Sequence, residues 1–167
     1  IAVRILSFTD IEPDVGFFRQ TIERAFEFRK AAGLTGNHKL NVFRLIHGEG
    51  DGLPGLVDDY YNGVIVMHTH SVGMYRIRRE LAGILSGLPH LKISAVYDKS
   101  GSTIPFMSGI RPENEFLHGS SESVIVTEYG FRFRIDWVGG QKTGFFIDQR
   151  ENRKLLGEFT KDRSVLN

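Results

Sequence analysis

The sequence contains no cysteine among its 167 residues. This absence excludes a disulfide framework, a zinc site built from thiolates and a cysteine nucleophile within the chain. Long hydrophobic runs are also missing, and no stretch approaches the roughly 18 apolar residues that a membrane-spanning helix needs. The chain does not open with a basic stretch followed by an apolar one, as a secretory signal would. We therefore expect a soluble, cytoplasmic protein.

Neither sign of charge dominates, since 21 Lys and Arg stand against 20 Asp and Glu. The hydrophobic share of 41% and the charged share of 25% are typical of a globular protein with a packed core. The charge is uneven along the chain, however, and residues 17–44 hold six Lys and Arg against two Glu. We interpret this basic block either as the solvated face of a helix or as a surface that contacts nucleic-acid phosphates.

The spacing of apolar residues predicts a first domain that mixes strands and helices. Strands are expected at 2–8, 41–47, 56–61, 64–70 and 92–97, and amphipathic helices at 17–32 and 74–87. Asn62-Gly63 favours a type I′ hairpin turn, and Gly33 is expected to end the first helix. Residues 98–121 have no clear period and are predicted to form a long loop. These elements predict an α+β domain over residues 1–122, with a mixed or antiparallel sheet and two packed helices.

A second unit is expected over residues 123–167. Residues 123–128 and 131–138 predict another hairpin, residues 149–160 a helix, and residues 164–167 the start of a buried strand. The chain opens at Ile1 inside a predicted strand and without an initiator Met. We therefore expect it to be part of a longer protein.

Three short motifs favour structural interpretations. Gly50–Gly55 fits the spacing of a dinucleotide-binding turn, but a strand follows where a helix is required, so we expect a tight loop in which Asp51 caps local amides. His68 and His70 share one face of a strand without a third ligand, which favours polar positions on an edge strand over a metal site. Asp58 and Asp59 point to opposite faces of a strand and are a poor acid–base pair.

The segment from Gly139 to Arg153, GGQKTGFFIDQRENR, is harder to explain as a linker. It concentrates glycines, two aromatic rings, a carboxylate, an amide and two guanidinium groups between a strand and a helix. The start of a helix exposes N–H groups and the positive end of the helix dipole, which attract anions. This density of special residues predicts a functional site.

The same segment, followed by RSVLN at residues 163–167, resembles the RlmI-type ribosomal RNA large-subunit methyltransferases, which use S-adenosylmethionine (SAM) to methylate C5 of a cytosine. RLIHGEGDGLPGLVDDYYNG (Arg44–Gly63) resembles a second motif of that family, and the likeness extends over essentially the whole chain. The resemblance implies a parent with an N-terminal PUA-type RNA-binding domain, this central domain, and a C-terminal Rossmann-like methyltransferase domain. This chain would hold the central domain and the truncated start of the methyltransferase domain.

The resemblance also implies roles for individual residues. Phe145, Phe146, Gln149 and Arg150 would lie beside the methionine end of SAM, and Lys142, Thr143 and Arg153 would contact ribosomal RNA. No catalytic residue and no metal ligand is expected in the chain, because the family's cysteine nucleophile and its Asp-Pro-Pro motif would lie beyond residue 167. The alternative is a non-catalytic RNA-binding or interdomain module. The Asp51–Gly55 loop matches the family motif without an evident chemical role.

Overall fold

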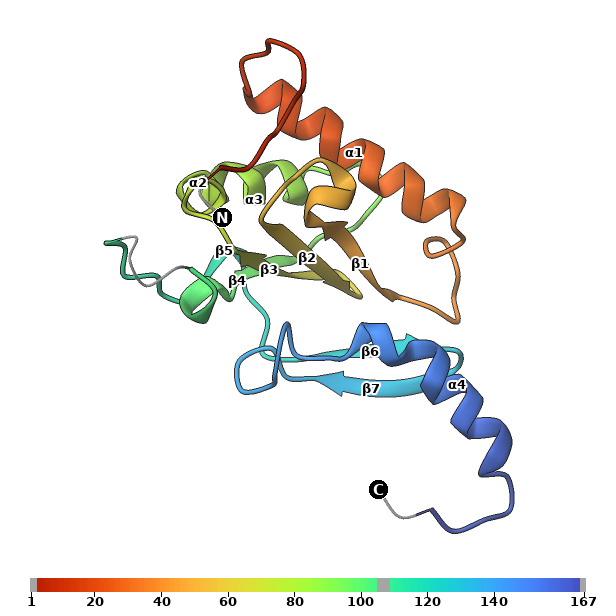
Figure 1. Ribbon diagram of the computed structural model, residues 1–167. Coiled ribbons are helices and arrows are strands. Elements are labelled where there is room, and N and C mark those ends of the chain that lie inside the picture. The colour runs from red at the N-terminus through yellow and green to blue at the C-terminus, as the bar shows by residue number, and fades with distance from the viewer. Residues whose placement is uncertain (1–2, 105–108, 166–167) are drawn as a thin grey trace.

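The computed structural model describes residues 3–104 and 109–165. The helices are α1 (Val15–Ala31), α2 (Val72–Arg76), α3 (Arg78–Ser86) and α4 (Arg150–Phe159), with short 3₁₀ turns η1 (Gly48–Asp51), η2 (Ser100–Ser102) and η4 (Ile147–Gln149). The strands are β1 (Val42–His47), β2 (Leu56–Tyr61), β3 (Val64–Thr69), β4 (Ala95–Asp98), β5 (Glu115–Gly119), β6 (Val124–Glu128) and β7 (Phe131–Ile135). These elements are arranged as a mixed sheet with α1, α2 and α3 on one face and a hairpin, followed by α4, on the other (Figure 1).

The main sheet has five strands in the order β1-β2-β3-β4-β5. Neighbouring strands are antiparallel except β3 and β4, which are parallel and are joined through α2 and α3. Asn62 and Gly63 form the predicted turn between β2 and β3, both with positive φ, as a type I′ turn requires. The second sheet is the β6–β7 hairpin alone.

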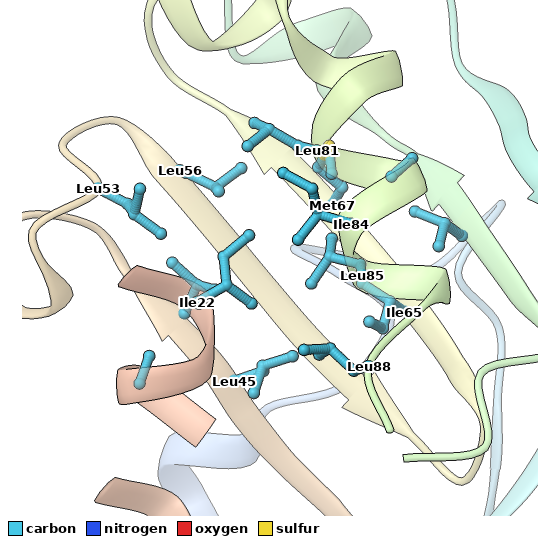
Figure 2. Packing of buried hydrophobic residues seen from close by; sticks show 14 of the residues in the cluster. Ile22, Leu45, Leu53, Leu56, Ile65, Met67, Leu81, Ile84, Leu85 and Leu88 are labelled. Atoms are coloured by element: carbon cyan, nitrogen blue, oxygen red, sulfur yellow. The ribbon is translucent and has the colours of Figure 1, made fainter. Parts of the chain in front are cut away.

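The larger hydrophobic core lies between the sheet and the helices α1 and α3 (Figures 1 and 2). Figure 2 shows Ile22 of α1 facing side chains of β1–β3. Leu81, Ile84 and Leu85 of α3 pack on the same face of the sheet, at the right of the view. A second core joins the opposite face of the sheet to the hairpin, and Trp137 and Tyr61 are fully buried in it. The hairpin is therefore packed against the sheet.

Helix α1 has clear signals at both ends. The Asp14 carboxylate accepts a hydrogen bond from the amide of Phe17 at 2.8 Å and caps the N-terminus. At the other end Gly33 has φ +72°, and the amides of Gly33 and Leu34 donate to the carbonyls of Lys30 and Arg29. This is a Schellman motif, so the prediction that Gly33 ends the helix is confirmed.

Several predicted elements need correction. Residues 3–8 form no strand, and Val3, Ile5 and Phe8 are exposed, because no neighbouring strand pairs with them; residue 2 lies outside the described part. The predicted loop at 98–121 contains β5, an edge strand whose half-exposed sequence EFLHG gives little hydrophobic signal.

The other corrections concern element limits and position. The helix predicted at 74–87 is broken at Ile77 into α2 and α3. His68 lies on the central strand β3 and is 9% exposed, so its assignment to an edge strand is wrong. Ser164 and Val165 are exposed coil and show no buried strand, while residues 166–167 lie outside the described part. Within the described residues, no helix has the length and apolar character needed to cross a membrane.

Candidate functional site

The segment singled out by sequence, residues 139–153, connects the hairpin to α4 and packs against the main sheet. Its glycines permit a tight fold of the loop on itself. A Cβ on Gly140 would lie 2.3 Å from the carbonyl oxygen of Asp136, and one on Gly144 would lie 2.8 Å from the same atom. The Asp136 carboxylate also accepts hydrogen bonds from the amides of Val138 and Gly139 at 3.0 and 2.9 Å. These glycines therefore allow a close approach of the loop to the protein's own backbone.

Thr143 connects this loop to the sheet and is 1% exposed. Its hydroxyl donates to Oδ2 of Asp59 at 2.6 Å and lies 2.7 Å from the hydroxyl of Tyr61. Because the Thr143 proton is directed at Asp59, the Tyr61 hydroxyl is the donor of the second bond. Burial, followed by the charge of Asp59, raises the pKa of Tyr61, which keeps that hydroxyl protonated as a donor. The predicted RNA contact by Thr143 therefore does not fit its position, because its hydroxyl is buried and used internally.

Asp59 is also the partner of Arg44, whose guanidinium reaches both carboxylate oxygens at 2.9 and 3.1 Å. The hydrogen bond that Arg44 donates to Asp59 raises the pKa of Arg44, and desolvation opposes this shift. Arg44, Asp59, Thr143 and Tyr61 thus form one hydrogen-bonded chain from β1 across β2 to the loop. The Asp59 carboxylate is fully buried, while the Arg44 side chain remains 36% exposed.

The two arginines of the segment converge on buried Glu128 of β6. Arg153 reaches both Glu128 oxygens at 2.7 and 2.9 Å and donates to the carbonyl of Phe146 at 2.9 Å. The Nε of Arg150 lies 3.6 Å from Glu128, and its guanidinium donates to the carbonyl of Val42 at 2.6 Å. These contacts attach α4 to the hairpin and to β1. The positive charges of Arg150 and Arg153, which were predicted to contact SAM and RNA, are therefore neutralised largely by Glu128.

Of the two adjacent aromatic residues, Phe145 is packed and Phe146 is exposed. Phe145 contacts Phe133 with ring centroids 5.1 Å apart and lies under the guanidinium of Arg153 at 4.3 Å. Phe146 is 39% exposed, and the ammonium of Lys142 lies 4.5 Å from its ring centroid. Lys142 also pairs with exposed Asp148 at 3.2 Å and lowers the pKa of that carboxyl.

Gln149, the remaining residue of the predicted SAM set, is exposed at the start of α4. Its side-chain oxygen accepts a hydrogen bond from Asn152 at 2.7 Å. Lys142, Phe146 and Gln149 are thus the predicted site residues with surface available to a ligand.

A cleft of about 490 Å³ opens beside the loop, and sequence reasoning missed most of its lining. It is bounded by Arg44, Val57, His68, His70, Lys99, Ser102, Thr103 and residues 140–143. Lys99 donates to the carbonyl of Gly140 at 2.5 Å and so joins the end of β4 to the loop. Burial lowers the pKa of Lys99 and, together with His70, lowers that of His68 to about 4. The sequence placed His68 and His70 on one face but gave no sign that Arg44 and Lys99 join them.

The Asp51–Gly55 loop has a structural role between α1 and β1. Both oxygens of Asp51 accept from the Arg29 guanidinium at 2.5 and 2.7 Å, and the amide of His47 donates to the same carboxylate at 2.6 Å. The expectation that Asp51 caps a local amide is confirmed, and Leu53 beside it is fully buried.

The curated relatives that the chain matches share one protein name. No family model matches the sequence. Ribosomal RNA large subunit methyltransferase I from Pseudoalteromonas atlantica is 36% identical over the whole chain, and the protein of that name from Shewanella frigidimarina is 37% identical. In both cases the chain spans 42% of the relative's length.

Solved structures agree on the fold. A protein from Streptococcus mutans described as a SAM-dependent methyltransferase superposes with a TM-score of 0.74 over 91% of this chain and 38% of its own, at 22% identity. A methyltransferase complexed with S-adenosylhomocysteine gives the same TM-score and identity over 37% of its chain. Along its whole length, the chain is thus similar to one segment of the proteins named ribosomal RNA large subunit methyltransferase I.

Proposed function

We propose that the chain is the central part of a SAM-dependent methyltransferase that transfers a methyl group to C5 of a cytosine in large-subunit ribosomal RNA. Its role is to place the RNA and to form one wall of the SAM pocket. The observation that carries this proposal is the 35–37% identity to curated relatives over the entire chain. We further propose that residues 1–122 form the central domain, that residues 123–167 begin the methyltransferase domain, and that a PUA-type domain flanks them in a cytoplasmic parent.

The cofactor role rests on the exposed part of the predicted set. SAM supplies the methyl group and carries a methionine end with an amine and a carboxylate. Gln149 offers a solvent-facing amide that can hydrogen-bond such groups, and Phe146 offers an exposed ring that can pack beside them. Phe145 and Arg150 support this wall from behind, because the ring of Phe145 packs on Phe133 and the Arg150 guanidinium donates to Val42.

The RNA role rests on Lys142, which is the exposed cation of the loop. Its backbone has φ +50°, a conformation that is uncommon for a residue with a side chain and often marks a functional position. Arg153 is committed to Glu128, so we assign it the positioning of α4 in place of a direct RNA contact. The sequence has no cysteine, and we assign no part of a cysteine-dependent nucleophilic step to this segment.

A second candidate is an interdomain module without a cofactor or RNA contact. It is favoured by the internal use of Thr143, Arg150 and Arg153, whose polar groups all serve packing between the hairpin, α4 and the sheet. The two candidates differ in what they require of the exposed residues: only the first needs Lys142, Phe146 and Gln149 to contact ligands.

Methyl transfer by the full-length protein that carries this segment tests the proposal. The assay measures labelled methyl transfer from SAM to large-subunit rRNA that lacks the modification, with bisulfite sequencing to locate a C5-methylated cytosine. We expect Gln149→Ala to raise the KM for SAM with an unchanged melting temperature, since it removes an exposed amide from the cofactor wall. Glu158→Ala, an exposed change further along α4, is the control. Activity without C5 methylation, or an unchanged KM in Gln149→Ala, would contradict the proposal or its cofactor part, respectively.

A further inference from the structure

The face of the sheet that carries the hairpin is covered only in part. Side chains alternate between faces along a strand, so His68 lies on the same face as Val66, which packs in the hairpin core. Arg44 follows Val42 on that face in the same way. Lys99 directly follows β4 and reaches this face, because its ammonium donates to the Gly140 carbonyl and its side chain lines the cleft. Beyond the hairpin, this part of the face forms the floor of the 490 Å³ cleft. The residues 140–143 form its wall.

The cleft concentrates positive charge. Arg44, Lys99 and Lys142 come from three distant parts of the chain, and none of the described residues that line the cleft is acidic. Asp59 forms a salt bridge with Arg44, and Asp148 forms one with Lys142. Neither aspartate lines the cleft. Lys99 has no carboxylate within salt-bridge distance among the described residues, and the contact of its ammonium is the Gly140 carbonyl. The Asp136 carboxylate acts on this charge only through space, so Lys99 forms no salt bridge with a described residue at the cleft.

Neutral hydrogen-bonding groups accompany these cations. The amides of Gln141, Lys142 and Thr143 are three consecutive N–H groups that have no acceptor among the residues described by the structure. His68 lines the cleft, is nine-tenths buried, and its Nε2 has no hydrogen-bond partner in the described part of the chain. Consecutive free amides beside cationic side chains are a common way for proteins to hold an anion.

We propose that this cleft binds phosphodiester groups of the RNA backbone, with Lys99 and Lys142 as the contacting cations and the 141–143 amides as additional donors. The inference rests on the proposed function for its choice of RNA as the source of the phosphates. It extends that function to Lys99 and Arg44, to which the family resemblance assigns no role in a site. Arg44 acts here as a positioning residue, because its guanidinium is held by Asp59 and holds the loop through Asp59 and Thr143.

Binding of a fluorescein-labelled single-stranded oligoribonucleotide, followed by fluorescence anisotropy over a series of salt concentrations, tests the proposal. The first variant is Lys99→Gln. We expect a weakening of roughly three- to tenfold and a reduction of about 0.7 in the slope of log K against log salt, the value for one lost phosphate contact to a single strand. Lys30→Gln removes the same charge from exposed α1 and should leave affinity and slope at wild-type values.

Gln141→Glu is a second variant that preserves every side-chain contact described above. Gln141 is exposed at the cleft wall, and a carboxylate there should repel a phosphate and weaken RNA binding. Gln20→Glu on the outer surface of α1 is its matched control. Circular dichroism melts confirm that all four variants are folded.

The outcomes separate this inference from the proposed function. Wild-type RNA affinity in both Lys99→Gln and Gln141→Glu, equal losses in the α1 controls, or no RNA binding by the wild-type chain would each overturn the cleft as the phosphate site. None of these results bears on whether the full-length protein methylates C5, which the methyl-transfer assay decides. If the full-length protein did not methylate the RNA, while Lys99→Gln and Gln141→Glu still weakened RNA binding, the proposed function would be contradicted and the phosphate site would stand.

Discussion

Asp58 is fully buried on β2, and neither of its carboxylate oxygens has a hydrogen-bond partner among the described residues. Burial, with the nearby charges of Asp59 and Asp98, raises its pKa well above the usual range. An aspartate that is more easily protonated in the folded state stabilises the protein fully at pH values below its unfolded pKa. That contribution declines as the pH rises through the folded pKa.

Asp58→Asn should therefore become progressively more stable than the wild type as the pH rises above about 4, close to the unfolded pKa. Each pH unit between the unfolded and folded pKa adds about 1.4 kcal/mol to the difference. Urea unfolding of both proteins at several pH values measures this difference, in which the other titrating groups largely cancel. Asp10→Asn, at an exposed position, is the control. A constant difference between Asp58→Asn and the wild type across this range would be inconsistent with a raised pKa.

Sequence reasoning at the level of single residues succeeded where the signal is local. Gly33, Asn62-Gly63 and Asp51 have roles set by neighbours a few positions away, and the structure confirms them. Thr143 behaves differently, because its partner Asp59 is 84 positions distant. A sequence shows that a threonine follows a lysine in a glycine-rich loop, but the buried carboxylate that takes its hydroxyl is visible only once the chain is folded.

At the scale of elements, the loop that links β7 to α4 depends on two glycines that lie against the backbone. Gly140→Ala would place a Cβ 2.3 Å from the carbonyl oxygen of Asp136, so the loop, in which the Gly140 carbonyl accepts from Lys99, must shift. We expect a loss of about 1–3 kcal/mol, as for other changes that force strain into a packed site.

Gly83→Ala supplies the matched control within α3. No heavy atom lies within 4 Å of the added Cβ, and its φ lies outside the positive range. Because alanine favours helix more than glycine, this change should stabilise the protein by about 0.5–1 kcal/mol. Chemical denaturation of the two variants compares them directly. Equal effects would show that Gly140 has no special packing role.

The elements themselves were predictable in proportion to their hydrophobic signal. Helix α1 and both hairpins have regular periods and turn residues, so their positions agree with the structure to within a few residues. Strand β5 was missed because an edge strand buries little and its sequence alternates weakly. Residues 3–8 show the converse, since β-branched residues form a strand only when a neighbouring strand supplies hydrogen bonds.

At the scale of the whole molecule, the hairpin and the main sheet are joined through a second hydrophobic core and the Thr143 hydrogen bonds. Thr143→Val removes one hydroxyl and leaves both Asp59 and Tyr61 short of a buried partner. We expect a loss of about 1–3 kcal/mol. Hydrogen exchange should become faster in β6, β7 and α4, while the amides of β2 and β3 remain protected.

Thr127→Val on β6 is the control for this prediction. Thr127 is half-buried, and the described hydrogen bonds at this residue involve its backbone amide and carbonyl. The substitution should leave exchange in the hairpin close to that of the wild type. If Thr143→Val accelerated exchange evenly over both sheets, the hairpin would be part of a single cooperative unit with the main sheet.

The 84-residue separation between Thr143 and Asp59 also has a consequence for synthesis on the ribosome. All five strands of the main sheet precede residue 120, so they emerge before the hairpin that covers them. Until that hairpin arrives, Tyr61, Val66 and Tyr97 present an apolar face to solvent, and Asp59 has Arg44 as its partner. The nascent sheet therefore passes through a period in which chaperone binding or premature association competes with the docking of its own C-terminal hairpin.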